Sequence, residues 1–309
     1  MSLKSITGYV DPELGNSTEE ASHALVYIIK GLQVPYKQVV AWYLTGAGTS
    51  GAKLWTLTKR IIQELYERSI LVRAVTSDMG GSNVGMWKAA GLNVNDGQQC
   101  SIAHPCNDQL QLYFVADVPH LLKNARSCLE KHDITVPTQV TESHGLPSNT
   151  ASMSHIEAVV ALQQNSELRV APRLSSQVRH PGQYGKMKVS CATKVFSHST
   201  SSALRSLADS GEIDKNAFTT AWLCECLNQW FDMMSNRKYK CALFENSTHV
   251  NKLQTMISVV QQLRVVGSKG NSTTLKPWQK AIILSTNAAL SLHNDLVVKG
   301  DYMFLLTCD

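Results

Sequence analysis

Apolar and polar positions in the first 136 residues alternate between strand-like runs and helix-like periodicity. β-branched and aromatic residues cluster in short runs that are typical of buried strands. These runs predict strands at residues 6–10, 23–32, 38–45, 70–78 and 111–120. Between most of them, apolar residues recur every three or four positions, as on one face of a helix. This spacing predicts helices at residues 53–69, 81–92 and 121–132. The order predicts an α/β fold, with a mixed sheet flanked by helices.

The pattern changes after residue 136. A polar stretch, TQVTESHGLPSNTASM, precedes a remainder in which helical periodicity prevails. Helices are predicted at residues 153–168, 185–209, 217–236, 249–266 and 276–297. We therefore divide the chain into a first domain at residues 1–136 and a second, mostly α-helical domain at residues 137–309.

Composition narrows the class of protein. The chain has 309 residues and a net charge of +5, which is compatible with nucleic-acid binding, but no block of Lys or Arg indicates a DNA-binding arm. None of the eight cysteines forms a CxxC pair, which disfavours a zinc ribbon and favours reduced thiols. There is no apolar signal core, and no apolar run approaches the roughly 20 residues that span a bilayer. We expect an intracellular, soluble protein with no membrane partner.

Two aspartates follow predicted strands. Asp78 ends the run ILVRAVTSD, and Asp117 lies at the end of QLYFVAD. Functional groups gather beyond the carboxyl ends of strands in open α/β sheets, and a carboxylate there can hold a divalent metal. Two such carboxylates could share a metal pair for phosphoryl transfer. The alternative is structural: Asp78 as a turn or cap residue, and Asp117 as the entry to a helix that includes Pro119.

The segment GAGTSGAK, at residues 46–53, resembles a phosphate-binding loop between a strand and a helix. It departs from the Walker pattern because Ala52 separates Gly51 from Lys53 and Leu54 follows. A dinucleotide site with GxGxxG spacing requires an acidic residue about 20 positions later, at the end of the next strand, and here the next strand-end carboxylate, Asp78, lies well past that position. We interpret it as a loop, and the nearby SIAHPC as a turn without a metal site.

The second domain contains residues that could bind a nucleotide. Lys188, Ser197 and Ser199 could contact a phosphate. The Asp232 carboxylate could accept two hydrogen bonds from the edge of guanine, and Phe231 could stack on the base. The alternative is that Phe231 is a core residue and Asp232 a surface residue of one helix.

Longer blocks support a family resemblance. The order AVTSDMGGSNVGMWKAAGL, HPC, LYFVADVPHLLKNARSCL, GKMKVSCATKVFSHSTSSAL, WFDMMSNR and LKPWQKAIILSTNAALSLHNDL resembles P-element-type transposases, including the THAP-domain transposases of animals. The resemblance covers nearly the whole chain. It implies an RNase H-like catalytic domain with three metal-binding acids and a GTP-binding domain inserted before the third. Such nuclear enzymes cut and join transposon-end DNA by two-metal phosphoryl transfer.

The resemblance also implies roles for individual residues. Asp78 takes the position of the second catalytic acid, a Mg2+ ligand, whereas Asp117 is a family feature outside the three acids. Phe231 and Asp232 align with the residues that recognise the base. By the same resemblance Lys188, Val189 and Ser197 line the nucleotide, and Arg173 falls near a lysine that contacts phosphate.

The chain departs from the family pattern at both ends. The segment with the first acid precedes the hairpin at ITGYVD, where this chain starts, and the third acid follows the LLT near Asp309. The THAP zinc module has no counterpart. Because two-metal catalysis needs carboxylates from several strands, we expect no strand transfer by this polypeptide alone. The prediction is a GTP-binding fragment or domesticated derivative of such a transposase. Its expected partners are transposon-end DNA, other transposase subunits or further copies of this chain. The alternative is a repressor or protein-interaction module without nucleotide.

Overall fold

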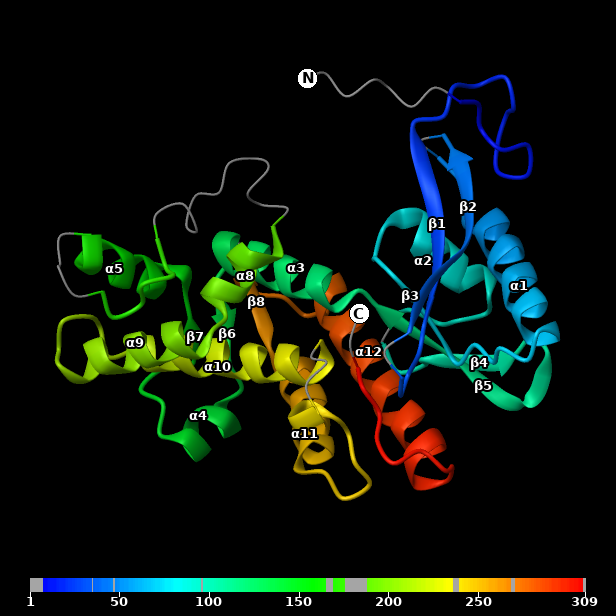
Figure 1. The fold of residues 1–309 in the computed structure, drawn as a ribbon. Coiled ribbons are helices and arrows are strands. Elements are labelled where there is room, and N and C mark those ends of the chain that lie inside the picture. Colours follow the sequence, from blue (N-terminus) through cyan, green and yellow to red (C-terminus); the bar gives the residue numbers. More distant parts are fainter. Residues whose placement is uncertain are drawn as a thin grey trace.

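The computed structural model describes residues 8–34, 36–46, 48–95, 97–164, 169–175, 188–235, 239–267 and 270–307. Parts of the predicted elements at residues 6–7, 165–168, 185–187 and 236, together with Asp309, lie outside the described residues. Figure 1 shows a region that contains the first five strands and a mostly helical region, with helices α3 and α12 between them.

The first region contains two separate sheets. Strands β1 (His23–Lys30) and β2 (Lys37–Thr45) form an antiparallel hairpin in which Val26 faces Trp42. The second sheet has the order β3-β5-β4, from β3 (Ala74–Ser77), β4 (Ser101–His104) and β5 (Asn107–Ala116). Strand β5 pairs in parallel with β3 and antiparallel with β4. The sheet is therefore mixed, which confirms the predicted α/β fold class.

Helices α1 (Gly51–Glu67) and α2 (Gly81–Ala89) flank this region. The hydroxyl of Ser50 accepts a hydrogen bond from the Lys53 amide at 3.3 Å and caps α1. A Cβ atom on Gly51 would lie 2.1 Å from the carbonyl carbon of Gly85. The last residues of GAGTSGAK therefore begin a helix that packs closely on α2, so the loop interpretation is wrong for residues 51–53.

Several boundaries in this region differ from the sequence prediction. In the described part of the strand predicted at residues 6–10, only Tyr9 forms an isolated bridge, with Glu20. The strand predicted at 70–78 is limited to Ala74–Ser77, the residues that pair with β5. The strand predicted to reach residue 120 ends at Ala116, because α3 (Val118–Lys131) begins directly afterwards with Pro119 in its first turn. SIAHPC is more than a turn, because residues 101–104 form β4 and pair with β5. Strand β4 has only four residues, which is too short for its alternation of apolar and polar positions to be recognised in the sequence.

The helical region comprises α4 (Thr138–His144), α5 (Met153–Gln164), α8 (Val189–Val195), α9 (His198–Asp209), α10 (Ala217–Met234), the short helix η1 (Tyr239–Cys241), α11 (Thr248–Gln262) and α12 (Pro277–His293), which a π-helical turn, Asn294–Val298, continues. A small sheet of order β7-β6-β8-β9 joins β6 (Ile134–Thr135), β7 (Thr150–Ala151), β8 (Arg264–Gly267) and β9 (Gly270–Asn271).

Two predicted helices are corrected here. The helix predicted at 185–209 is broken in two, because Ser197 adopts extended backbone and caps a new helix. The helix predicted at 249–266 ends at Gln262, because Arg264–Gly267 pairs with β6 in the small sheet.

Helix α12 connects the two regions through hydrogen bonds within the core. The backbone amide of Ala116 in β5 donates to the Ser285 hydroxyl at 2.9 Å, and the Trp230 indole in α10 donates to the Thr286 hydroxyl at 2.9 Å. By length and composition, Pro277–Val298 could span a membrane, which corrects the expectation that no apolar run approaches this length. Because 67% of its apolar window is buried, the observed contacts are those of a core helix.

Candidate functional site

The two strand-end aspartates lie at one corner of the β3-β5-β4 sheet. Asp78 directly follows β3, and the Asp117 amide, directly after β5, donates to the Ser77 carbonyl at 2.9 Å. Strands β3 and β5 are parallel neighbours, so both aspartates stand at the same carboxyl edge. Asp117 also occupies the N-cap position of α3, although its side chain makes no capping hydrogen bond. The edge predicted from the sequence is therefore present.

Asp78 is held in a fixed, ionised form. Its Oδ1 atom accepts hydrogen bonds from the Gly80 amide and the Asn83 side chain, both at 2.7 Å. Burial raises the pKa of this carboxyl. The two hydrogen bonds, together with the electrostatic effect of His120 and Lys123 on α3, outweigh burial and lower the pKa. The Oδ1 atom thus stabilises the turn that leads into α2, which is the structural role that the alternative predicts for Asp78.

Within the described residues, no group of three or more His, Cys, Asp or Glu side chains could hold a metal ion. Divalent magnesium requires near-octahedral oxygen coordination, and protein carboxylates normally supply one or two of the ligands. The role of Asp78 as a metal ligand therefore stays a prediction.

Three of the other predicted residues line a cleft of about 510 Å³ between α8, α9 and α10. Arg173 and Ser197 line it, as do Lys194 and Asn228. A cleft of this size is within the range that holds drug-sized ligands. The remaining lining is rich in hydroxyl groups, from Ser190, Thr193, Ser199 and Thr200. The cleft combines cationic and hydroxyl groups, which are suited to phosphate oxygens.

The segment that carries Arg173 is anchored by a buried side chain. Gln163, at the end of α5, accepts a hydrogen bond from the Ala171 amide at 3.2 Å. Its amide group donates to the carbonyls of Ala171 and Leu174. These bonds satisfy a buried polar side chain and fix the backbone on both sides of Arg173. The exposed guanidinium can therefore reach the cleft from a defined position.

The amino terminus of α9 opens onto the same cleft. The Ser197 hydroxyl accepts from the Thr200 amide at 3.1 Å and donates to the Lys194 carbonyl at 3.1 Å, so it serves as the helix cap. No acidic residue lies in the first turn of α9. The free amide groups and the helix dipole favour an anion here. Ser197 would therefore act through the helix end that it organises, a role that the sequence reasoning did not specify.

Lys188 and Val189 stand beside the cleft. Lys188 precedes α8 and is exposed, and Val189 is the first residue of that helix. Neither residue contributes to the described lining, although the next residue, Ser190, does.

Phe231 and Asp232 belong to the face of α10 that reaches the cleft. Asn228 lines the cleft, and its side-chain amide donates to Asp232 Oδ2 at 3.2 Å. Phe231 and Asp232 follow Asn228 by three and four residues, so they share its side of the helix. Phe231 is half-buried and Asp232 is exposed. The ring packs partly on the core and the neighbouring carboxylate is exposed, as the structural alternative predicts. Neither residue lines the described cleft, and base recognition by this pair stays a prediction.

Sequence reasoning missed Lys194 and Asn228. A signal existed for Lys194, because it lies four residues after Ser190 and three before Ser197. Asn228 lies four residues before Asp232, which is also helical spacing. Periodicity alone does not show which helical face meets a cleft, and therefore neither residue was distinguishable from a surface position.

Comparisons with known families match both regions. Residues 1–91 match the TNP-like, RNase H N-terminal domain, and residues 119–247 match the TNP-like, GTP-binding insertion domain. The two matches lie in the order that the resemblance predicts and together cover more than two thirds of the chain. The chain belongs to the P-element-type transposase family. The division of domains at residue 136 stays a prediction.

Two individual transposases are similar in sequence to this chain, which agrees with the family assignment. The Transposable element P transposase of Drosophila melanogaster is 24% identical over 292 residues, which cover 94% of this chain and 36% of the relative. The human DNA transposase THAP9 is 27% identical over 247 residues, 76% of this chain and 26% of the relative. The chain therefore spans about a third or less of the curated relatives it matches.

A solved structure shares the fold. The Drosophila P element transposase strand transfer complex matches with a TM-score of 0.78 and 22% identity, over 99% of this chain and 66% of that chain. At this level of identity the likeness establishes the fold alone.

Proposed function

We propose that this chain binds GTP in the cleft between α8, α9 and α10, as part of a P-element-type transposase or a protein derived from one. The supporting observation is the convergence of Arg173, Lys194 and the start of α9 on a cleft that Asn228 connects to Asp232. The sequence match to the GTP-binding insertion domain supports the same ligand.

The chemistry of the cleft and of the adjoining face of α10 supports a guanine nucleotide as the ligand. The phosphates would lie against the cations and the amino terminus of α9, because a multiply charged anion gains from both. The base would lie toward Phe231 and Asp232. Guanine presents two adjacent donors, N1–H and the exocyclic amine, to a carboxylate, whereas adenine lacks this pair. A paired contact of this kind discriminates against the wrong base by about 1–3 kcal/mol.

We further propose that the chain takes part in reactions at transposon-end DNA in the nucleus, with transposase subunits or further copies of itself, but does not carry out strand transfer alone. The described residues contribute one predicted metal-binding acid, Asp78, whereas two-metal phosphoryl transfer needs several carboxylates in line. The proposal therefore makes GTP binding the activity to test in this chain.

Titration calorimetry with GTP, ATP and xanthosine triphosphate tests the proposal. We expect GTP to bind about 5- to 150-fold more tightly than ATP, which is the range of the base contact. In Asp232→Asn the preference should move from GTP toward xanthosine triphosphate, because xanthine carries a carbonyl acceptor where guanine carries an amine donor. Asp209→Asn is the matched control, since this exposed aspartate ends α9 at the far end of that helix.

Three results separate the alternatives. A switch of base preference in Asp232→Asn supports recognition by this carboxylate in a way that simple loss of folding cannot reproduce. Loss of all nucleotide binding in Lys53→Ala, with no effect of Asp232→Asn, would support a site at GAGTSGAK instead. A folded chain that binds none of the three nucleotides would refute the proposed function.

The second candidate function is a protein-interaction module without nucleotide. It is favoured by the outer face of the β1–β2 hairpin, where Val26, Ile28, Val39 and Trp42 are 45% to 64% exposed. Exposed apolar patches on this scale mark interaction or self-association sites. We expect the isolated chain to self-associate, and Trp42→Ser to shift sedimentation velocity profiles toward the monomer. Identical profiles for both chains would remove the support for this candidate.

A further inference from the structure

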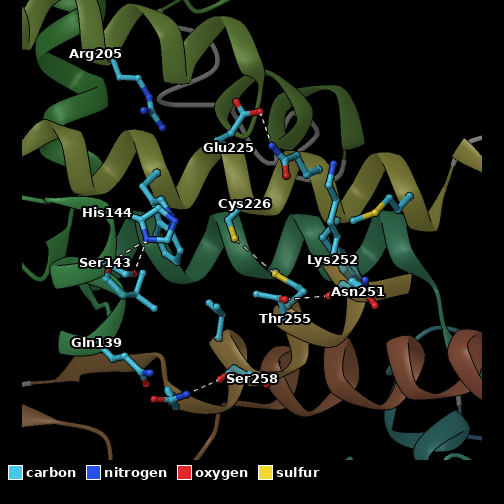
Figure 2. A pocket seen from close by; sticks show the side chains of 18 residues that line it. Gln139, Ser143, His144, Arg205, Glu225, Cys226, Asn251, Lys252, Thr255 and Ser258 are labelled. Carbon is cyan, nitrogen blue, oxygen red and sulfur yellow. Dashed lines mark hydrogen bonds between the residues drawn. The ribbon is translucent and has the colours of Figure 1, made fainter. Parts of the chain in front are cut away.

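A second cavity of about 640 Å³ lies on another face of α10, between α4, α10 and α11 (Figure 2). Its floor is apolar and includes Trp222 and Trp230 from α10 with Met256 and Val259 from α11, all of them buried. Of the described residues that line it, none belongs to the lining of the nucleotide cleft. This groove is therefore separate from the GTP-binding cleft proposed above.

The groove is elongated and has helical walls. Helix α10 lines it from Trp222 to Met233, and α11 lines it from Asn251 to Gln262. Each of these segments is about 16 Å long at 1.5 Å of rise per residue. A groove of this length accommodates about three turns of a third helix. Its methionine side chains can adapt their shape to an incoming apolar residue.

The backbone chemistry of the walls favours a helical occupant over an extended one. The amide and carbonyl groups within α10 and α11 bond inside their own helices, so the walls offer no strand edge. An extended peptide over an apolar floor would leave its own backbone groups without partners, at a cost in free energy. An α-helix satisfies its backbone internally and presents apolar side chains every three or four residues.

The charges at the rim determine the polarity of the occupant. Arg205 from α9 and Lys252 from α11 stand at the rim, and in the described part of the chain neither has an ion-pair partner. The rim carboxylate, Glu225, already accepts from Gln229 at 3.0 Å and lies 3.1 Å from His198. The two cations outnumber the one rim carboxylate, so the rim is net positive and complements an acidic partner.

The thiol in the groove does not indicate covalent chemistry. Cys226 lies 3.9 Å from the sulfur of Met256, on the apolar floor (Figure 2). Burial raises the pKa of Cys226 to about 12, and the charge of Glu225 adds to the effect. A thiol in such an environment stays protonated and is a poor nucleophile. Cys226 is best described as part of the apolar floor.

We propose that this groove binds a short amphipathic α-helix of a partner protein, with its apolar side chains on the floor and acidic side chains facing Arg205 and Lys252. The occupant would be about three turns long and would carry apolar residues at helical spacing, flanked by Asp or Glu. The proposal does not depend on GTP binding, because the two cavities share no lining residue.

A display library of 16-residue helices tests this proposal. The library has a fixed apolar stripe and random flanking residues, and it is selected on the full chain with counter-selection on Thr255→Trp. Thr255 is exposed on the groove wall, so its replacement fills the groove from the solvent side. We expect the selected helices to be enriched in Asp and Glu at the flanks. Their affinity should fall about tenfold in the double variant Arg205→Glu and Lys252→Glu, and their affinity for the parent chain should fall as the salt concentration rises.

Controls distinguish this result from loss of folding and from a different ligand. Both variants should keep the thermal unfolding midpoint and the GTP affinity of the parent chain. The proposal is overturned if the selected helices are neutral or basic, if none is selected, or if they bind the Thr255→Trp variant equally well. Displacement of a selected helix by a single-stranded oligonucleotide would assign the groove to nucleic acid, which also overturns it.

Discussion

The contact between Gly51 and Gly85 gives a direct test of how α1 packs on α2. In Gly51→Ala, the new Cβ atom would lie 2.1 Å from the carbonyl carbon of Gly85 and 2.4 Å from the amide nitrogen of Met86. Ordinary carbon contacts are about 3.5–4.0 Å. Both neighbours are backbone atoms, so a side-chain rotation cannot relieve the clash. The two helices would have to separate by more than an ångström.

The magnitude follows from the energetics of overpacking. Adding a methyl group to a close-packed contact typically costs about 1–3 kcal/mol in the free energy of unfolding. Alanine is favoured over glycine inside a helix by about 0.5–1 kcal/mol, which offsets part of this cost. The control is Gly81→Ala at the start of α2, where an added Cβ meets no atom within 4 Å. We expect that variant to be neutral or slightly stabilised.

Urea unfolding, followed by circular dichroism, measures both variants. With an m-value of about 3 kcal/mol/M, the expected loss in Gly51→Ala lowers the midpoint by up to about 1 M. Equal midpoints for Gly51→Ala and Gly81→Ala would refute the packing of α1 on α2.

The GTP affinity of the same variant is a second measurement. We expect Gly51→Ala to bind GTP like the parent chain while it remains folded, whereas a phosphate loop at GAGTSGAK predicts that binding is lost.

Further predictions concern pH and one buried ion pair. Burial is the main cause that lowers the pKa of His104 and of His155 below the ordinary value of about 6.5. Below pH 6.5 these histidines therefore bind more protons in the unfolded chain than in the folded chain. Their contribution to the free energy of unfolding is fully present above pH 6.5 and is lost as the pH falls toward their lowered pKa values. Urea midpoints at pH 7.5 and 5.5 measure this loss, and His155→Gln should reduce it; an unchanged pH dependence would contradict the assignment. Asp295 accepts from Tyr113 at 2.6 Å and pairs with Arg73 at 3.2 Å. Asp295→Asn should cost about 2–4 kcal/mol, because the Arg73 side chain is only 9% exposed and would keep an unpaired charge; a midpoint equal to that of the parent would show that water screens the pair.

The sequence by itself determined the long, strongly periodic elements and the family. The apolar stripe of α1, the β-branched runs of β1 and β2, and the helical spacing of α10 depend on local patterns that remain visible without partners. The order of the sequence blocks indicated the two regions, because a long series of matched residues is more specific than any short motif. The same blocks placed Asp78 at a strand end.

Only the tertiary structure decided the elements and sites whose energy comes from distant partners. Strand β4 and the strand at 264–267 exist because they pair with residues elsewhere in the chain, and local periodicity contains no information about that pairing. The same holds for Asn228, which is a surface residue of α10 until α8 and α9 form a cleft beside it. The groove between α10 and α11 also appears only on folding, because each helix is amphipathic alone but the shape of the gap depends on how they pack.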